Sequence, residues 1–301
     1  MASSKLPVYS ALVSDLAIAV SKFIAAAVTG SSAMISEGIH SVIDSINQIL
    51  LLIGIRSSKK KPDENRPFGY GKELYFWSFV VSLLIFSLGG GVSFYEGIVR
   101  LYHPVNLENA SWNYIVLAIG FAFTIFSVII TLKAFNKQRG DTPFWEAIKQ
   151  SKDPSTFIVL LQDVGDLLGL IVAFLGVYFG HLFNNSHSDG IASIVIGLIL
   201  MAISGVLVRE SRSLLMGETA GKKTLRDIVK LTEADPSVIK VKRHFSMYMA
   251  PEEIVLQLIT VFKDGLTTSQ IAEAIERIQK NIKRKYPRFK QIFIEPGLVK
   301  K

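Results

Sequence analysis

His40 and Asp44 lie one helical turn apart within a long apolar stretch, 31–55. Residues at positions i and i+4 share a helix face, so the imidazole and the carboxylate point in the same direction. Ionisable groups inside a membrane span are costly unless they face a cavity, an ion or a partner. The pair therefore predicts a functional site, and the alternative is a polar contact that joins two helices by hydrogen bonds.

Asp163, in the apolar stretch 155–180, is expected at the same depth as His40. Each lies about nine residues, or about 14 Å, into a core about 30 Å thick, and the two spans enter that core from opposite sides. One imidazole with two carboxylates suits a first-row divalent cation. Tetrahedral zinc fits in particular when a fourth ligand or water completes the coordination.

The composition indicates a membrane protein. Half of the 301 residues are hydrophobic and the mean hydropathy is +0.38, while charged residues, at 19%, fall below the roughly 25% of soluble domains. The absence of cysteine excludes disulfides and thiolate metal sites. Six segments are long enough to cross a bilayer, so we expect an α-helical membrane protein with six transmembrane helices. These segments are 8–29, 31–55, 74–99, 112–133, 155–180 and 190–208.

Basic residues gather in two of the links between spans, 56–72 and 133–152, whereas the first and fifth links carry no Lys or Arg. The positive-inside rule then places both termini in the cytoplasm of a multi-pass protein, as in a bacterial-type inner membrane. The net charge of +8 is largely explained by the basic residues on the cytoplasmic side, so it does not imply a nucleic-acid partner.

The last part of the chain has the composition of a soluble domain, and we expect a division into residues 1–214 and 215–301. Helical spacing at 222–233 and 269–286 and β-branched runs at 238–249, 254–263 and 291–295 predict the order αββαβ. This order suits a small α+β domain with helices on one face of a three-stranded sheet. Thr267 and Gln270 form a capping box that opens the second helix. Burying a sheet face against a second subunit would help so small a domain.

Three motifs lie on these elements: GSSAMISEGIHSVIDS in the second span, RPFGYGKE in the loop after it, and SDGIASIVIGLILM at the start of the sixth. Together they resemble the cation diffusion facilitators, a family of zinc transporters. The resemblance covers nearly the whole chain and is to the subgroup of human zinc transporter nine and its bacterial relatives in particular. It implies a homodimer with a ferredoxin-like, metallochaperone-like cytoplasmic domain over 215–301.

The transport site of that family consists of two motifs of the form [HD]xxxD. The resemblance places His40 and Asp44 in the first motif and Asp163 at the acid of the second. The remaining position falls on Val159, which cannot bind a metal.

The fourth ligand is therefore open among Asp166, Gln162, Asp15 and water. Asp166 is about 60° around the helix from Asp163 and serves equally well as a ligand, a helix–helix hydrogen-bond partner or a proton relay. For Asp15 the alternative is a charge-neutralising pair with Lys22, two turns further along the same face.

These features favour a secondary transporter that exports a divalent cation, most readily Zn²⁺, in exchange for protons by alternating access. Metal and protons compete for the site because imidazole must be neutral and carboxylates ionised to bind metal. A site with one imidazole raises Mn²⁺ and Fe²⁺ as alternatives, and the valine leaves a transport-inactive scaffold or regulator as another. No zinc-protease, serine-elbow or phosphate-loop motif occurs, so we expect neither an enzyme nor a cofactor. The expected partners are the lipid bilayer, divalent cations, protons and a second copy of the chain.

Overall fold

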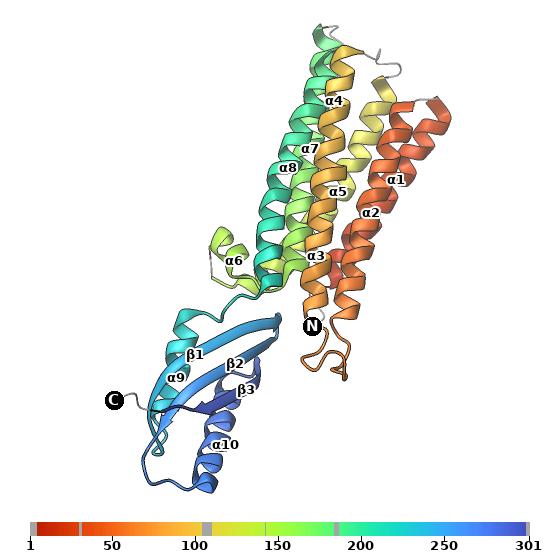
Figure 1. The fold of residues 1–301 in the computed structure, drawn as a ribbon. Helices are drawn as coiled ribbons and strands as arrows, with labels where there is room; N and C mark the ends of the chain where they lie inside the picture. Colours follow the sequence, from red (N-terminus) through yellow and green to blue (C-terminus); the bar gives the residue numbers. More distant parts are fainter. Residues whose placement is uncertain (1–4, 30–31, 104–109, 142, 184–186, 299–301) are drawn as a thin grey trace. The chain divides into compact units, whose positions relative to one another are not determined.

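The computed structural model describes residues 5–29, 32–103, 110–141, 143–183 and 187–298. The chain divides into two compact units. One comprises Met1–Lys60 with Glu73–Arg212, and the other comprises Lys61–Lys72 with Ser213–Lys301. The first is the long helical bundle of Figure 1, and the second contains the β-sheet.

Among the described residues, six helical segments are long and apolar enough to cross a membrane, which confirms the predicted helical membrane fold. The fifth and sixth spans are extended beyond the predicted apolar stretches, the sixth as far as Met216. Helix propensity explains the difference, because charged residues such as Arg209 and Glu210 continue a helix well after hydropathy falls. The helices of this part of the chain are α1 (Lys5–Thr29), α2 (Ser32–Ser57), α3 (Lys72–Leu84), η1 (Ile85–Gly91), α4 (Val92–Tyr102), α5 (Ala110–Arg139), α6 (Phe144–Gln150), α7 (Pro154–Phe183) and α8 (His187–Met216).

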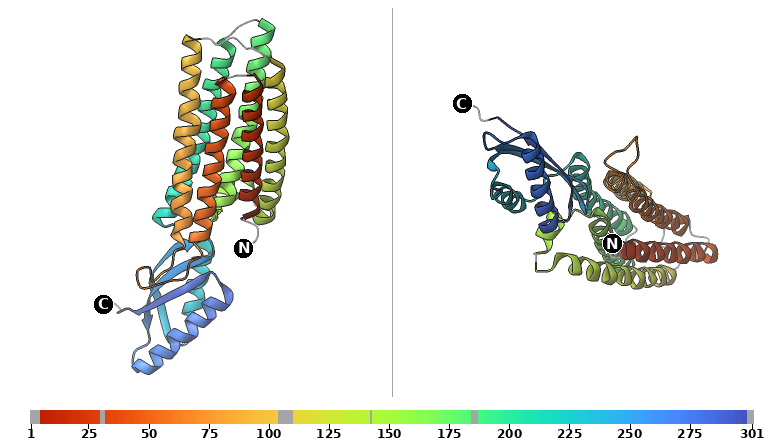
Figure 2. Two further views of the ribbon diagram at one scale, coloured as in Figure 1. Left: turned by 90° about the vertical axis from the view of Figure 1, so that its right-hand side faces the viewer. Right: turned by 90° about the horizontal axis from the view of Figure 1, so that it is seen from below.

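The six spans lie side by side in one bundle, as the two views of Figure 2 show. Helix α1 packs against α2 and α5, and α5 packs against α7. Helices α4 and α8 approach each other closely at Gly97, where an added Cβ would lie 2.6 Å from the backbone nitrogen of Ile194. Small residues at such seams allow backbones to pack tightly in a membrane.

The third span is interrupted at mid-length by the π-helical segment η1, which hydropathy did not predict. The N–H of Val92 donates to the carbonyl of Ser87, five residues earlier, and the segment ends in three glycines. A Cβ at Gly90 would lie 2.5 Å from Met201 of α8, so the two helices approach each other closely at this glycine. π-Helical turns inside α-helices are frequent at functional sites.

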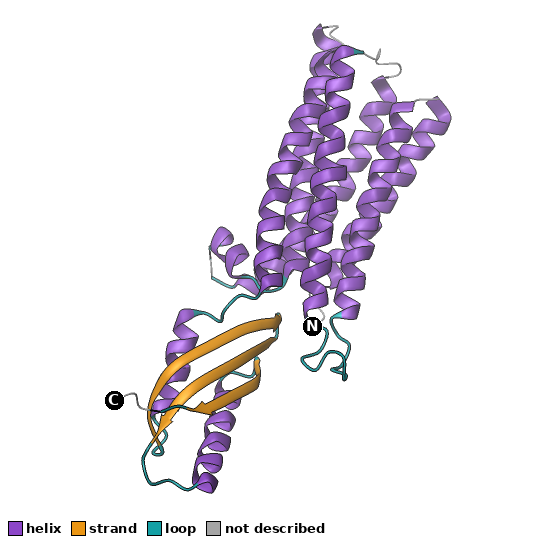
Figure 3. Ribbon diagram, viewed as in Figure 1, coloured by secondary structure: helices purple, strands orange, loops and turns teal. Residues whose placement is uncertain are grey.

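The second unit has the predicted αββαβ order, drawn in Figure 3. Strands β1 and β2 are antiparallel, and β2 and β3 are parallel, in the order β1-β2-β3. Both helices cover one face of the sheet, where Ile228, Ile278 and Leu256 belong to one buried apolar core. The elements are α9 (Lys222–Glu233), β1 (Val238–Ala250), β2 (Glu253–Phe262), α10 (Thr268–Lys285) and β3 (Phe289–Pro296).

The other face of the sheet carries an exposed row of side chains. Phe245 of β1 is paired with Gln257 of β2, which is paired in turn with Phe293 of β3. Paired residues of neighbouring strands project from the same face, and the two phenylalanines are 45% and 49% exposed. An apolar row of this kind on an uncovered sheet face is typical of an interaction surface.

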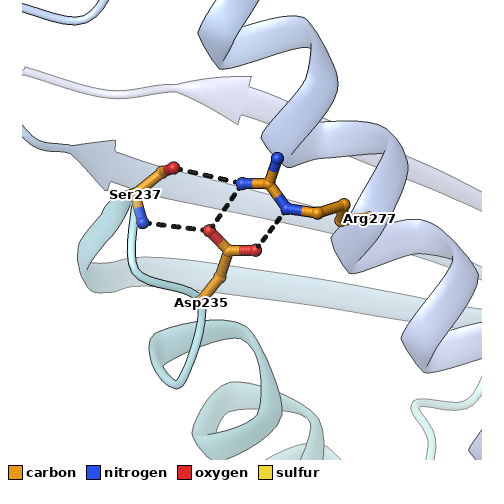
Figure 4. Close-up of polar contacts among 3 residues, drawn as sticks. All are labelled: Asp235, Ser237 and Arg277. Atoms are coloured by element: carbon orange, nitrogen blue, oxygen red, sulfur yellow. Dashed lines mark hydrogen bonds and ion pairs between the residues drawn. The ribbon is translucent and has the colours of Figure 1, made fainter.

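A polar cluster ties the turn after α9 to α10 (Figure 4). Arg277 donates to both carboxylate oxygens of Asp235 at 3.2 Å and to the hydroxyl of Ser237, whose backbone N–H also donates to Asp235. Burial raises the pKa of Asp235, but these hydrogen bonds outweigh burial and hold the pKa below its usual value. The link is therefore complete at neutral pH and is lost as the pH falls through that lowered pKa.

Helix α10 begins with the predicted capping box, since Thr267 Oγ1 accepts from the N–H of Gln270 and the Gln270 side chain accepts from the N–H of Thr267. Substituting Thr267→Ala should weaken the start of α10 by about 1 kcal/mol. We expect faster hydrogen exchange of the first-turn amides of α10 in the full chain. The control is Thr268→Ala, one residue further on and also exposed. Equal exchange in the two variants would contradict the capping role.

Candidate functional site

A cavity of about 350 Å³ lies inside the helical bundle, and the predicted site residues contribute to its wall. His40 and Asp44 line it from α2, Asp163 and Asp166 from α7, and Asp15 from α1. Helices α1 and α2, which are consecutive, and the distant α7 thus direct four carboxyl groups and an imidazole into one space.

His40 and Asp44 keep the helical spacing that the sequence predicts. The His40 Nε2 and Asp44 Oδ2 atoms are 3.9 Å apart, and the side chains are 28% and 19% exposed. Because neither side chain is sealed by its neighbours, both are available to a ligand in the cavity. The side chain of Glu37, one turn earlier, lies outside the described residues.

Asp163 is more deeply buried, at 5% exposed, and is held by α5. The hydroxyls of Ser127 and Thr131 both donate to its Oδ2 atom, at 2.9 and 3.2 Å. The two donors occupy one carboxylate oxygen and fix its orientation, which leaves the other oxygen as an acceptor or ligand. Partners that orient a ligand in this way commonly accompany metal-binding carboxylates.

Asp15 and Asp166 complete the acidic wall. Asp15 interacts electrostatically with Asp44, Asp166 and Asp163, and its Oδ2 atom is buried without a hydrogen-bond partner among the described residues. A buried polar oxygen without a partner is unusual, and it suits a position where a cation or a proton is bound in part of the working cycle.

Gln162 and Val159 are not among the residues that line the cavity. The Gln162 side chain is 3% exposed and accepts a hydrogen bond from Gln48 of α2 at 3.2 Å. Val159 is fully buried. Of the candidates for a fourth ligand, Asp15 and Asp166 therefore face the cavity, and Gln162 joins α7 to α2.

Within the described ranges, no three His, Asp or Glu side chains are grouped closely enough to hold a metal ion together. The wall thus presents its oxygen and nitrogen donors around an open space in this conformation. Carboxylates with one imidazole suit a divalent first-row cation, and a smaller separation between the helices would be needed to surround it.

Sequence reasoning missed two polar features of the site. Ser127, which lines the cavity, and Thr131, which also donates to Asp163, lie one turn apart in the apolar α5, and that spacing was the available signal. At the other end of the cavity, Arg100 of α4 forms ion pairs with Glu96 and with Asp189 of α8. In the sequence a charged residue at the edge of a span resembles a loop residue, so the place of Arg100 in the cavity wall was not apparent.

Six spans around a cavity lined by carboxylates define an α-helical membrane protein with an acidic space between its helices. The model of the cation efflux transmembrane domain matches residues 8–216, and the chain belongs to the cation efflux family. Its relatives are named as transporters and not as enzymes.

Among these relatives is the mitochondrial proton-coupled zinc antiporter SLC30A9 of Mus musculus, 34% identical over 72% of this chain. The matched part is 39% of that relative, so the chain spans about two fifths of its length. The manganese efflux system protein MneP of Bacillus subtilis is 23% identical over 94% of this chain and 92% of its own. The cadmium, cobalt and zinc/H(+)-K(+) antiporter of Bacillus velezensis is 25% identical over 83% of this chain and 75% of its own.

The two hydroxyls on Asp163 yield a prediction for cation binding. Ser127→Ala should weaken the affinity of the purified protein for Zn²⁺ about tenfold, because the carboxylate loses its shorter hydrogen bond and its orientation. Isothermal titration calorimetry measures the change. The control is Ser82→Ala, an equally buried hydroxyl outside the cavity wall. Equal affinities in the two variants would mean that Ser127 does not orient a ligand.

Proposed function

We propose that this chain is a secondary transporter that exports a divalent cation from the cytoplasm in exchange for protons, with Zn²⁺ as its principal substrate. The observation that carries the proposal is the acidic cavity lined by residues of the six spans. Membership of the cation efflux family and the printed name of the mouse zinc antiporter support it.

In this proposal His40, Asp44 and Asp163 bind the cation, and Asp166 or Asp15 supplies the fourth ligand. Since the described donors surround an open space, binding would draw α2 and α7 together around the ion. Such a movement is the change between inward and outward exposure in a transporter whose site lies near the midplane.

Proton coupling follows from the same groups. A carboxylate or an imidazole that binds a metal must first lose its proton, so cation loading expels protons and protonation favours release. No separate energy source is needed if the membrane maintains a pH gradient. The names of two relatives, which include proton coupling or H(+), support this part of the proposal.

The orientation proposed is cytoplasmic for both termini and for the domain at 215–301. It rests on the lysines and arginines of the links 56–72 and 133–152, which the positive-inside rule assigns to the cytoplasm. The setting that we propose is a bacterial-type inner membrane.

Manganese is the second candidate substrate, because a relative matched over nearly its whole length is named for manganese efflux. One imidazole among several carboxylates is also a relatively hard ligand set. His40→Asp should therefore shift the preference of the protein from Zn²⁺ toward Mn²⁺.

Flux into sealed vesicles tests the function. Vesicles that expose the cytoplasmic face and have an acidic lumen should accumulate Zn²⁺, and collapse of the pH gradient should stop accumulation. His40→Ala, Asp44→Ala and Asp163→Ala should each reduce the flux about a hundredfold or more, since each removes a ligand. The control is Asp63→Ala, an exposed acid outside the cavity. Failure of the unmodified protein to move zinc, manganese, iron or cobalt would contradict transport.

We also propose a twofold homodimer that is held partly by the exposed sheet face of the second unit. Phe245→Asp with Phe293→Asp should shift the protein in mild detergent from dimer to monomer, because charges would replace the apolar row. Light scattering with size-exclusion chromatography measures the mass. Leu298→Asp, exposed but outside the sheet, is the control. A monomeric unmodified protein, or a double variant that stays dimeric, would contradict this interface.

A further inference from the structure

Lys22 contributes a basic side chain to the wall of the acidic cavity. It lies two turns after Asp15 on α1, is half-buried, and lines the same space as His40 and Asp44. Its Nζ atom donates to the hydroxyl of Ser41 of α2 at 3.0 Å. This contact holds the ammonium group at the level of His40, the residue before Ser41 in the chain.

The charges that face Lys22 across the cavity are mainly negative. Asp166 of α7 interacts electrostatically with Lys22, with Asp44 and with Asp163, and Asp15 interacts with the same set of acids. The other positive group in the wall is Arg100, which already forms ion pairs with Glu96 and Asp189. Lys22 therefore acts on the acidic side of the cavity through Asp166.

A divalent cation entering the cavity meets this arrangement. The ion and the ammonium group are attracted to the same carboxylates and repel each other, and in a space of about 350 Å³ with a low dielectric that repulsion is strong. Without Lys22 the four acids would bind the ion more tightly and would be slower to release it. A transporter needs affinity sufficient for loading but weak enough for release.

We propose that Lys22 is a tethered counter-cation that balances part of the carboxylate charge and lowers the affinity of the cavity for the transported ion. The inference rests on the proposed function, since in it Lys22 lowers the affinity for the ion and thereby speeds its release during transport. Ser41 acts with it as the anchor that keeps the ammonium group beside the acids and away from the apolar helix surface.

The test compares Lys22→Gln, which removes the charge but can still hydrogen-bond to Ser41, with Lys22→Arg, which keeps the charge. Zn²⁺ binding by the purified protein is measured by calorimetry, and KM and maximal rate are measured in vesicles. Lys22→Gln should bind Zn²⁺ about tenfold more tightly, with a lower KM and a lower maximal rate. Lys22→Arg should remain within about twofold of the unmodified protein in all three quantities.

Lys133→Met provides a control for the loss of a basic residue from a span, since Lys133 of α5 is exposed and lies outside the cavity wall. Unchanged or weaker Zn²⁺ binding in Lys22→Gln would overturn the inference, as would an equal gain in Lys133→Met. If Lys22→Gln does not fold, Ser41→Ala is the second variant, and its affinity should rise because the ammonium loses its anchor. Unchanged affinity in that variant would also overturn the inference.

The two proposals fail differently. If the unmodified protein binds Zn²⁺ without moving it, the transport proposal fails, and calorimetry still measures the effect of Lys22 on affinity. If the unmodified protein moves Zn²⁺ and Lys22→Gln matches it in binding, KM and rate, the transport proposal stands and the role of Lys22 is wrong.

Discussion

Carboxylates are costly inside a bilayer, and the rest of the helical unit depends on how this cost is met. Four aspartates from α1, α2 and α7 face one cavity, and three of them have a compensating neighbour. Two hydroxyls of α5 hold Asp163, His40 lies beside Asp44, and Lys22 acts on Asp166. These neighbours offset part of the cost of burying the carboxylates in the membrane. Because the offset is partial, each carboxylate can still exchange a protein partner for a cation or a proton.

Much of this arrangement could be predicted from the sequence because it follows from local spacing. The i and i+4 positions of His40 and Asp44, the depth of Asp163 and the capping box at Thr267 need only helical geometry. The hydroxyls on Asp163 could not be assigned in the same way, because Ser and Thr are common in membrane helices and their partners come from another span. Gln162 illustrates the same limit: its direction depends on the packing of α7 against α2, where it meets Gln48.

The second unit was more readily predicted, because its strands and helices alternate apolar and polar residues with clear periods. Its order and its sheet face follow from those periods, with strand ends displaced by only a few residues, as at β3. The membrane helices lack such a pattern, since lipid and protein neighbours are both apolar. Polar residues are then the main guide to which face of a span turns inward, and Arg100 lies just outside the span predicted at 74–99.

The π-helical segment explains how α4 comes to face the cavity. Each residue of an α-helix turns the chain by about 100°, so one residue more or fewer within η1 would change the direction of everything that follows. Ser93, Glu96 and Arg100 line the cavity after this segment, whereas Leu88 lines it from within. The number of residues in the third span is therefore constrained, because it sets which side chains of α4 face the cavity. A deletion of a single residue between Ile85 and Gly91 would leave the span long enough to cross the bilayer but would turn its charged end toward lipid.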